Sequence, residues 1–191
     1  MRKTLLTLLA LAALPAPALA QMDHSTMNMA SPATGMSQPM DLSALRTLTG
    51  QAFDRAFLSM MIPHHQAAVA MSQAILGTKD PKVKAWATAI IKDQNREIAQ
   101  MNTLLKSYGG VDSRMQAMMK SMMGDMASSV KSASNKDRTF VQGMIPHHAS
   151  AIDMANLALQ KSQNLSVLKL ARDITRAQAA EIYDFKAYLL R

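Results

Sequence analysis

The pentapeptide Met-Ile-Pro-His-His occurs twice in the chain, at residues 61–65 and again at residues 144–148. The flanks repeat at the same offset, with these matched pairs: Asp54 and Asp137, Arg55 and Arg138, Phe57 and Phe140, Ala68 and Ala151, Met71 and Met154, Leu76 and Leu159. The chain has five histidines, and four of them lie in the two copies. We therefore interpret the chain as two related halves, each of which presents the same His-His-Met cluster.

Helical periodicity surrounds each copy. From Thr49 the period becomes helical: one face, from Phe57 to Ile75, repeats at intervals of three and four residues and includes His64, which predicts an α-helix that Gly77 ends. Pro63 interrupts this pattern, so the helix either kinks there or starts afresh. A second helix is predicted over residues 81–107, with glycines after it as a stop signal.

The second half repeats both helices, at residues 137–161 and 165–190, and no stretch has the alternation of a strand. Two helical hairpins joined by a long connector predict an all-α, ferritin-like four-helix bundle with a short Met-rich helix in the crossover. The expected organisation is a signal peptide at 1–20, a disordered tail containing Met and His at 21–48, and a bundle at 49–191. The bundle divides into repeat one at 49–110, a Met-rich connector at 111–135 and repeat two at 136–191.

The first 20 residues have the pattern of a secretory signal peptide. Arg2 and Lys3 precede an apolar stretch that ends near Leu14, and small residues at 18–20 predict cleavage after Ala20. The apolar stretch is too short to cross a membrane, and no later segment is apolar enough to do so. We therefore expect a periplasmic or secreted protein without a membrane span.

Charge and composition restrict the ligands. The formal net charge of +8 falls to +6 without Arg2 and Lys3, and the basic residues are scattered among only four Phe, three Tyr and one Trp. Nucleic-acid binding is therefore not expected. The chain has no Cys and 18 Met, which excludes disulfides and thiolate sites and leaves thioether and imidazole as the soft ligands.

On a helix, Met61 lies one turn before His64 and His65, and Met71 lies two turns after His64. The same spacing recurs in the second half. Imidazole with thioether favours copper, above all Cu(I), whereas zinc sites more often use thiolate or carboxylate. A lone core histidine is usually structural, but two duplicated pairs favour metal binding. The candidate metal ligands are Met61, His64, His65, Met71, Met144, His147, His148 and Met154.

Two further groups of residues are weaker metal candidates. In the tail, Met22, His24, Met27 and Met29 form a short Met/His string that composition alone explains equally well. In the connector, Met115, Met118, Met119, Met122, Met123 and Met126 make a single stripe along one predicted helix. A packing or docking surface and a string of weak thioether sites for Cu(I) are equally good interpretations of that stripe.

Glu97 and Glu181 are the only glutamates, and they occupy equivalent positions in the two halves. They are weaker metal candidates as well, or they hold a nearby His or Arg. A ferritin-like metal oxidoreductase that uses the His pairs with these glutamates is the alternative function. Di-iron bundles require Glu-x-x-His spacing, whereas here Gln100 and Asp184 follow three residues later, which disfavours that alternative.

The paired Asp-x-x-Phe…Met-Ile-Pro-His-His…Met pattern, over residues 50–190, resembles the bacterial family named domain of unknown function 305. The resemblance implies a ferritin-like bundle, a copper-binding role in metal tolerance, and the eight ligands named above. Gly143 departs from the repeat because the first half has Met60 there. We predict a non-enzymatic protein that sequesters or passes on Cu(I), with Cu(II) as the other oxidation state. The expected partners are copper ions and a further copper-handling protein, and the oligomeric state stays open.

Overall fold

The computed structural model describes residues 40–191, and all of its regular elements are α-helices, as predicted. The helices are α1 (Ser43–Arg46), α2 (Gly50–Ile75), α3 (Pro81–Ser107), α4 (Ser113–Met123), α5 (Met126–Ser132), α6 (Lys136–Lys161) and α7 (Leu165–Leu189). The predicted long helices correspond to α2, α3, α6 and α7, with ends that differ by a residue or two at most.

Five helices begin at an Asp or Asn whose side chain accepts hydrogen bonds from backbone N–H groups of the first turn. These residues are Asp80, Asp112, Asp125, Asn135 and Asn164. The first backbone N–H groups of a helix have no partner within the helix, and such caps satisfy them. The caps therefore fix where α3 to α7 begin, and with them the register of the residues that face the core.

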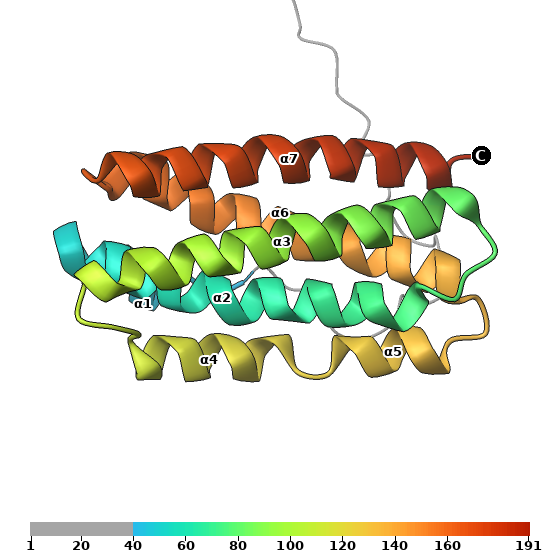
Figure 1. The fold of residues 1–191 in the computed structure, drawn as a ribbon, viewed down its shortest axis with the longest axis horizontal. Coiled ribbons are helices and arrows are strands. Elements are labelled where there is room, and N and C mark those ends of the chain that lie inside the picture. The colour runs from blue at the N-terminus through green and yellow to red at the C-terminus, as the bar shows by residue number, and fades with distance from the viewer. Residues whose placement is uncertain (1–39) are drawn as a thin grey trace, which may run out of the picture. The chain divides into compact units, whose positions relative to one another are not determined.

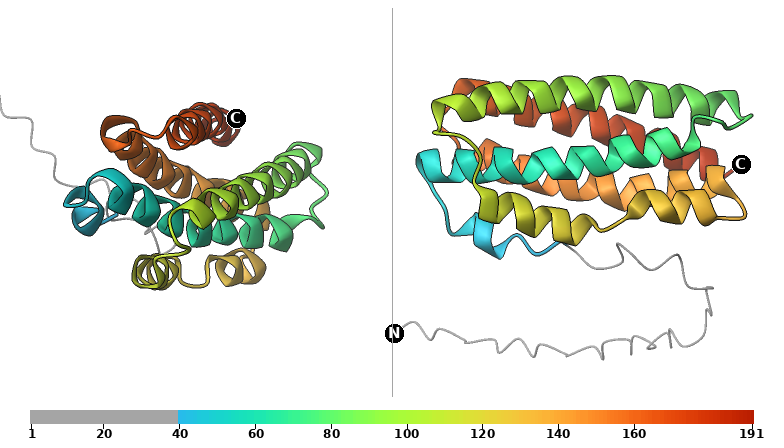
Figure 2. Two further views of the ribbon diagram at one scale, coloured as in Figure 1. Left: turned by 60° about the vertical axis from the view of Figure 1, so that its left-hand side comes forward. Right: turned by 60° about the horizontal axis from the view of Figure 1, so that its bottom comes forward.

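Helices α2 and α6 occupy the middle of the bundle (Figures 1 and 2). Each pairs with the next long helix as a hairpin, α2 with α3 and α6 with α7, and α4 and α5 pack on the other side of α2. Four buried phenylalanines, Phe53, Phe57, Phe140 and Phe185, are among the largest core side chains. The two helices that carry the repeated pentapeptide are thus covered from both sides.

Proline lies inside both central helices, as Pro63 in α2 and Pro146 in α6. Each removes one backbone donor, so the carbonyl four residues earlier lacks its helical partner. Even so, α2 is one helix from Gly50 to Ile75 and does not start afresh at Pro63. Tertiary packing on both sides of α2 holds the helix together across the missing bond.

The connector contains the predicted short Met-rich helix as α4, but the prediction that the stripe continues along this helix to Met126 is wrong, because the connector forms two helices. The break falls at Gly124, whose φ of 54° and ψ of −146° lie in a region essentially restricted to glycine. Met126 therefore lies on α5, apart from the five methionines of α4. The connector is fastened to α2 by Arg55, whose guanidinium donates to the carbonyls of Gly110 at 2.8 Å and Val111 at 2.9 Å.

The expected boundary between tail and bundle at residue 48 also needs correction. Leu42 and Leu45 are buried, and α1 packs against α2. Lys161 holds this segment by donating to the carbonyls of Arg46 and Leu48 at 2.6 and 3.0 Å. The packed part therefore begins near residue 42. The predicted signal peptide at 1–20 and the tail candidates Met22, His24, Met27 and Met29 lie outside the described residues.

Within residues 40–191, none of the helices has both the length and the apolar character that crossing a membrane requires.

Candidate metal centre

The two His pairs meet where α2 and α6 run antiparallel. Later residues of α2 lie against earlier residues of α6: His64 contacts Ser150, whereas Met71 lies beside Gly143. The rings of His64 and His147 lie close together, with centroids 3.9 Å apart and planes tilted by 39°. We call the four imidazoles, in the order His65, His64, His147 and His148, the histidine row. All four residues are fully buried.

The two central imidazoles both donate a hydrogen bond from Nε2. His147 Nε2 lies 3.1 Å from the backbone carbonyl oxygen of His64, which can only accept. His64 Nε2 lies 2.8 Å from the Ser150 hydroxyl, and that hydroxyl gives its own proton to the carbonyl of His147 at 2.7 Å. Since the serine proton is already committed, His64 must be the donor to Ser150.

The two outer imidazoles face the only glutamates of the chain. His65 Nε2 is hydrogen-bonded to Glu97 Oε2 at 2.7 Å, and His148 Nε2 lies 2.7 Å from Glu181 Oε2. The second contact has the distance but not the alignment of a hydrogen bond, so it is an ion-pair contact only. The Glu97 side chain is 11% exposed and that of Glu181 is 25% exposed, so the first pair is better shielded from water.

The Nδ1 atoms of all four histidines are buried and have no hydrogen-bond partner. A neutral imidazole that carries its proton on Nε2 has an unprotonated Nδ1 with a free lone pair. In His64, His65 and His147, a hydrogen bond to an acceptor assigns the proton to Nε2. In its neutral form each of these rings therefore turns an unshared lone pair into the protein interior, which is the state that a metal ion requires of a histidine ligand.

Burial keeps the central rings neutral. It lowers the pKa of His64 well below 6.5, and the charge that His147 would carry lowers that pKa further. The pKa of His147 is lowered in the same way, first by burial and then by neighbouring His148 and His65. A proton is therefore a weak competitor for the lone pairs of these two rings near neutral pH.

Ring spacing separates the row into two pairs. The centroids are 6.2 Å apart in His64–His65 and 6.0 Å apart in His147–His148, against 3.9 Å between the two central rings. Within residues 40–191, no three His, Asp or Glu side chains converge in the manner of a metal site. The structure thus brings the predicted histidines together in one row, in which the ring spacing is wider within each adjacent pair than between the two central rings.

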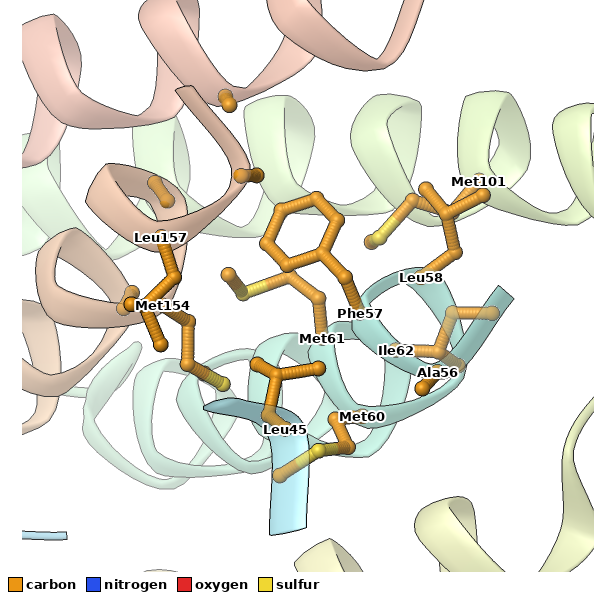
Figure 3. Close-up of a cluster of buried hydrophobic side chains, with 14 of the residues drawn as sticks. Leu45, Ala56, Phe57, Leu58, Met60, Met61, Ile62, Met101, Met154 and Leu157 are labelled. Carbon is orange, nitrogen blue, oxygen red and sulfur yellow. The ribbon is translucent and has the colours of Figure 1, made fainter. Parts of the chain in front are cut away.

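The four predicted methionine ligands are also buried: Met61, Met71, Met144 and Met154. They belong to two clusters. Met61 and Met154 pack in the cluster that also holds Met60 and Leu45 (Figure 3), and Met71 and Met144 pack in the other. A Cβ on Gly143 would lie 3.0 Å from the Met71 terminal methyl, so that methyl occupies the space beside this glycine. The sequence departure at Gly143 therefore makes the surroundings of the two His pairs different.

Three polar residues of the core escaped the sequence-based prediction. Ser150 bridges the two central histidines, and its signal is a break in the repeat, since the first half has Ala67 at the equivalent position. Gln94 and Gln178 are equivalent, almost fully buried, and without hydrogen-bond partners on either amide atom. Each is a polar residue in an otherwise apolar helix stripe, and this departure is the sequence signal that could have identified them.

Comparison with known sequences finds a family pattern in both halves. The model of the family described as "Domain of unknown function (DUF305)" matches residues 2–105 and again residues 77–189. The uncharacterized protein L153 of Acanthamoeba polyphaga mimivirus is 49% identical over 65 residues, which cover 32% of this chain and 41% of that protein. The chain thus matches less than half the length of this relative.

Solved structures of similar proteins include CopM in its Cu(I)-bound form. It is 34% identical with a TM-score of 0.60, and the match covers 71% of this chain and 94% of that one. CopM in the Cu(II)-bound form is 35% identical with the same TM-score over 71% and 95% of the two chains. A putative secreted DUF305 protein from Streptomyces coelicolor, 23% identical, has the same fold with a TM-score of 0.64 over 72% and 91%.

Proposed function

The chain belongs to the DUF305 family, and from that premise we propose that it binds copper as Cu(I) in the histidine row. The observation that carries the proposal is the set of buried Nδ1 atoms without partners. A buried polar atom without a partner costs about 1–3 kcal/mol, and natural proteins rarely hold several such atoms together. Four equivalent ones on four adjacent rings are best explained as the ligand atoms of a metal site.

We propose two ions for each chain, one for each adjacent His pair. Two imidazoles that hold one ion between them have ring centroids about 6 Å apart, given metal–nitrogen bonds of about 2 Å. The separations of 6.2 Å in His64–His65 and 6.0 Å in His147–His148 match that requirement. The rings of His64 and His147, whose centroids are only 3.9 Å apart, leave no room for an ion between them.

The monovalent ion is the better match to these ligands. Imidazole and thioether are soft ligands that select Cu(I), and each half places buried methionines near its His pair. The row also has one glutamate for each half, so two monovalent ions and two carboxylates balance in charge. The related CopM structures with Cu(I), Cu(II) and Ag support copper-group binding by this fold.

Glu97 and Glu181 hold the outer imidazoles in our proposal and are not ligands themselves. A carboxylate that accepts from the remote nitrogen of a metal-binding histidine fixes its tautomer and raises the basicity of the other nitrogen. The geometry around His65 fits this role. The alternative oxidoreductase would require these carboxylates on the metal, and it predicts oxygen consumption above the protein-free rate with Cu(I) or Fe(II).

The proposed biological role is to sequester Cu(I) or pass it on to another copper-handling protein. The signal-like residues 1–20 support a periplasmic or secreted location for that role, where thioethers remain available as soft ligands. Thiols in such an oxidising compartment tend to form disulfides, so Met and His take the place of thiolates as soft ligands.

The test is a metal titration of the full mature chain, from residue 21 onward, with Ag(I) as the air-stable substitute and Cu(I) under reductant. We expect two tight ions for the wild type, one for His64→Ala/His65→Ala, and none when all four histidines of the row are replaced. His24→Ala is the matched control because it removes the fifth histidine and leaves the row untouched.

Two results would contradict the proposal. The first is two tight ions in the variant without the four row histidines. The second is a two-bond ¹H–¹⁵N spectrum of the wild type in which Ag(I) shifts the Nε2 resonances and leaves Nδ1 unchanged. That spectrum reads the ligand atom directly in the folded wild-type protein, so it remains informative if the multiple variant fails to fold.

A further inference from the structure

Helix α4 has an unusual apolar face. Its eleven residues contain five large apolar side chains, and all five are methionine: Met115, Met118, Met119, Met122 and Met123. The stripes of α3 and α7 are built mainly from Val, Ile, Leu and Ala instead. Leucine has similar volume and equal helix propensity, so packing alone does not account for the uniform choice of methionine.

The five methionines lie at two depths. Met115, Met119 and Met123 are buried, whereas Met118 and Met122 are only partly buried at the edge of the same cluster. Met118 and Met122 are one turn apart on the helix, so their thioethers lie on one face. The guanidinium of Arg114 lies 3.9 Å from the Met115 sulfur, so a cation at the rim of the bundle can reach a thioether of this helix.

The buried methionines of α4 continue into those of α2. Met115, Met119 and Met123 share one core cluster with Met60 and Met61, and α4 packs directly on α2 (Figure 1). Met61 lies one helical turn before His64 and His65. The core cluster at the partly exposed edge of α4 therefore also contains the methionines of α2 that precede the first His pair.

The second half has no such series. No helix of the second hairpin corresponds to α4, and Met60 and Met101 are replaced by Gly143 and Phe185 at the equivalent positions. The other core cluster, which does not include α4, contains only Met71 and Met144 as buried methionines. Buried thioether is thus concentrated in the cluster to which α4 and Met61 belong.

We propose that Met118 and Met122 form an outer binding site for a soft monovalent cation, Cu(I) or Ag(I). From there the ion moves along the buried methionines of α4 and α2 to the His64–His65 pair, which fills before His147–His148. The route rests on the proposed function, because it supplies the histidine row. The outer site itself requires only thioether sulfur, which is a ligand for such ions and not for hard cations.

The test uses Ag(I) and two measurements on the full mature chain. In protein labelled with ¹³C at the methionine methyl groups, the first additions of Ag(I) should shift the Met118 and Met122 signals. In stopped-flow loading, Met118→Leu/Met122→Leu should slow filling of the histidine row several-fold and leave its final stoichiometry unchanged. Met126→Leu is the matched control, because this partly buried methionine lies on α5, beyond Gly124, and its loss should leave the loading rate unchanged.

The outcomes separate the two proposals. If the double variant loads at the wild-type rate and the Met118 and Met122 methyl signals do not move, the route is wrong and binding by the row still stands. If these methyl signals move and the histidine resonances never respond, the outer site exists and the row is not the destination. Slower loading by the Met126→Leu control as well would overturn the route, because the effect would then follow from any change in packing.

Discussion

Acidification should destabilise the metal-free protein through His64 and His147. Burial holds the pKa of both imidazoles well below the value of 6.5 that an unperturbed histidine has. Between that lowered pKa and 6.5, the unfolded chain binds protons that the folded protein does not, so the free energy of unfolding rises with pH. The stability that these neutral rings allow is fully present above about pH 6.5 and falls as the pH drops below it.

The expected magnitude follows from proton linkage. Each histidine that takes up its proton only on unfolding contributes about 1.4 kcal/mol for each pH unit. Integrated from pH 7.5 to pH 5.5, two such groups remove up to about 2.7 kcal/mol from the free energy of unfolding. For a domain with a total stability of about 5–15 kcal/mol this is a large loss.

Urea unfolding of the metal-free protein, followed by circular dichroism at pH 7.5, 6.5 and 5.5, measures this loss. The comparison variant is His147→Gln, whose amide retains a donor for the His64 carbonyl and has no proton to gain. We expect the pH-dependent loss of unfolding free energy to fall by at least about half in this variant, because one of the two histidines is gone. The reduction should exceed half, because His147 also contributes to the lowered pKa of His64, so the remaining histidine is less perturbed. An undiminished loss in the variant, or a wild type that becomes more stable between pH 7.5 and 5.5, would refute the reasoning.

Three further substitutions have defined outcomes. Ser150→Ala removes the acceptor for His64 and should lower the free energy of unfolding by about 1–3 kcal/mol in chemical denaturation. Glu97→Gln should weaken Ag(I) binding by one of the two sites about 10- to 100-fold in competition titrations. Glu181→Gln should have a smaller effect, because the contact between Glu181 and His148 is more exposed and poorly aligned. Gly124→Ala places a Cβ on a backbone with φ of 54° and should cost about 1–3 kcal/mol, visible as a lower urea midpoint.

The fold could be predicted to a large extent because its signals are local. Helix periodicity, the Asp80 and Asn164 caps, and the repeated pentapeptide each act within a few residues, and together they define the four long helices. The break at Gly124 was missed because the methionine spacing on either side continues the helical period. Only the glycine itself, in a backbone region that other residues avoid, distinguishes two helices from one.

The early start of the packed region was missed for a different reason. Residues 42–46 are too few to show a period, and their burial depends on contacts far along the chain. Lys161 binds the carbonyls of Arg46 and Leu48 from the end of α6. No pattern within the tail predicts a partner at that distance.

The proposed ligand residues could be nominated from the duplication, but their chemical state could not. The sequence places His64 and His65 on one helix and gives no indication of which ring nitrogen carries the proton. That state depends on three acceptors from other helices: Ser150, Glu97 and the backbone carbonyl of His64, which accepts from His147. The tautomer is a tertiary property, and the Nδ1 lone pairs became visible only once those acceptors were in place.

The same acceptors explain how a duplicated helix pair can hold two identical imidazoles side by side with the Nε2 donor of each ring satisfied. If the halves were exact copies, each central histidine would donate to the backbone carbonyl of the other. His147 does so directly, whereas His64 reaches the carbonyl of His147 through the Ser150 hydroxyl. The Ser150 hydroxyl thus stands between His64 Nε2 and the His147 carbonyl, and the two rings lie 3.9 Å apart at a tilt of 39° with both Nε2 donors satisfied. Because Nε2 is the donor in both rings, Nδ1 is left without a hydrogen-bond partner in both.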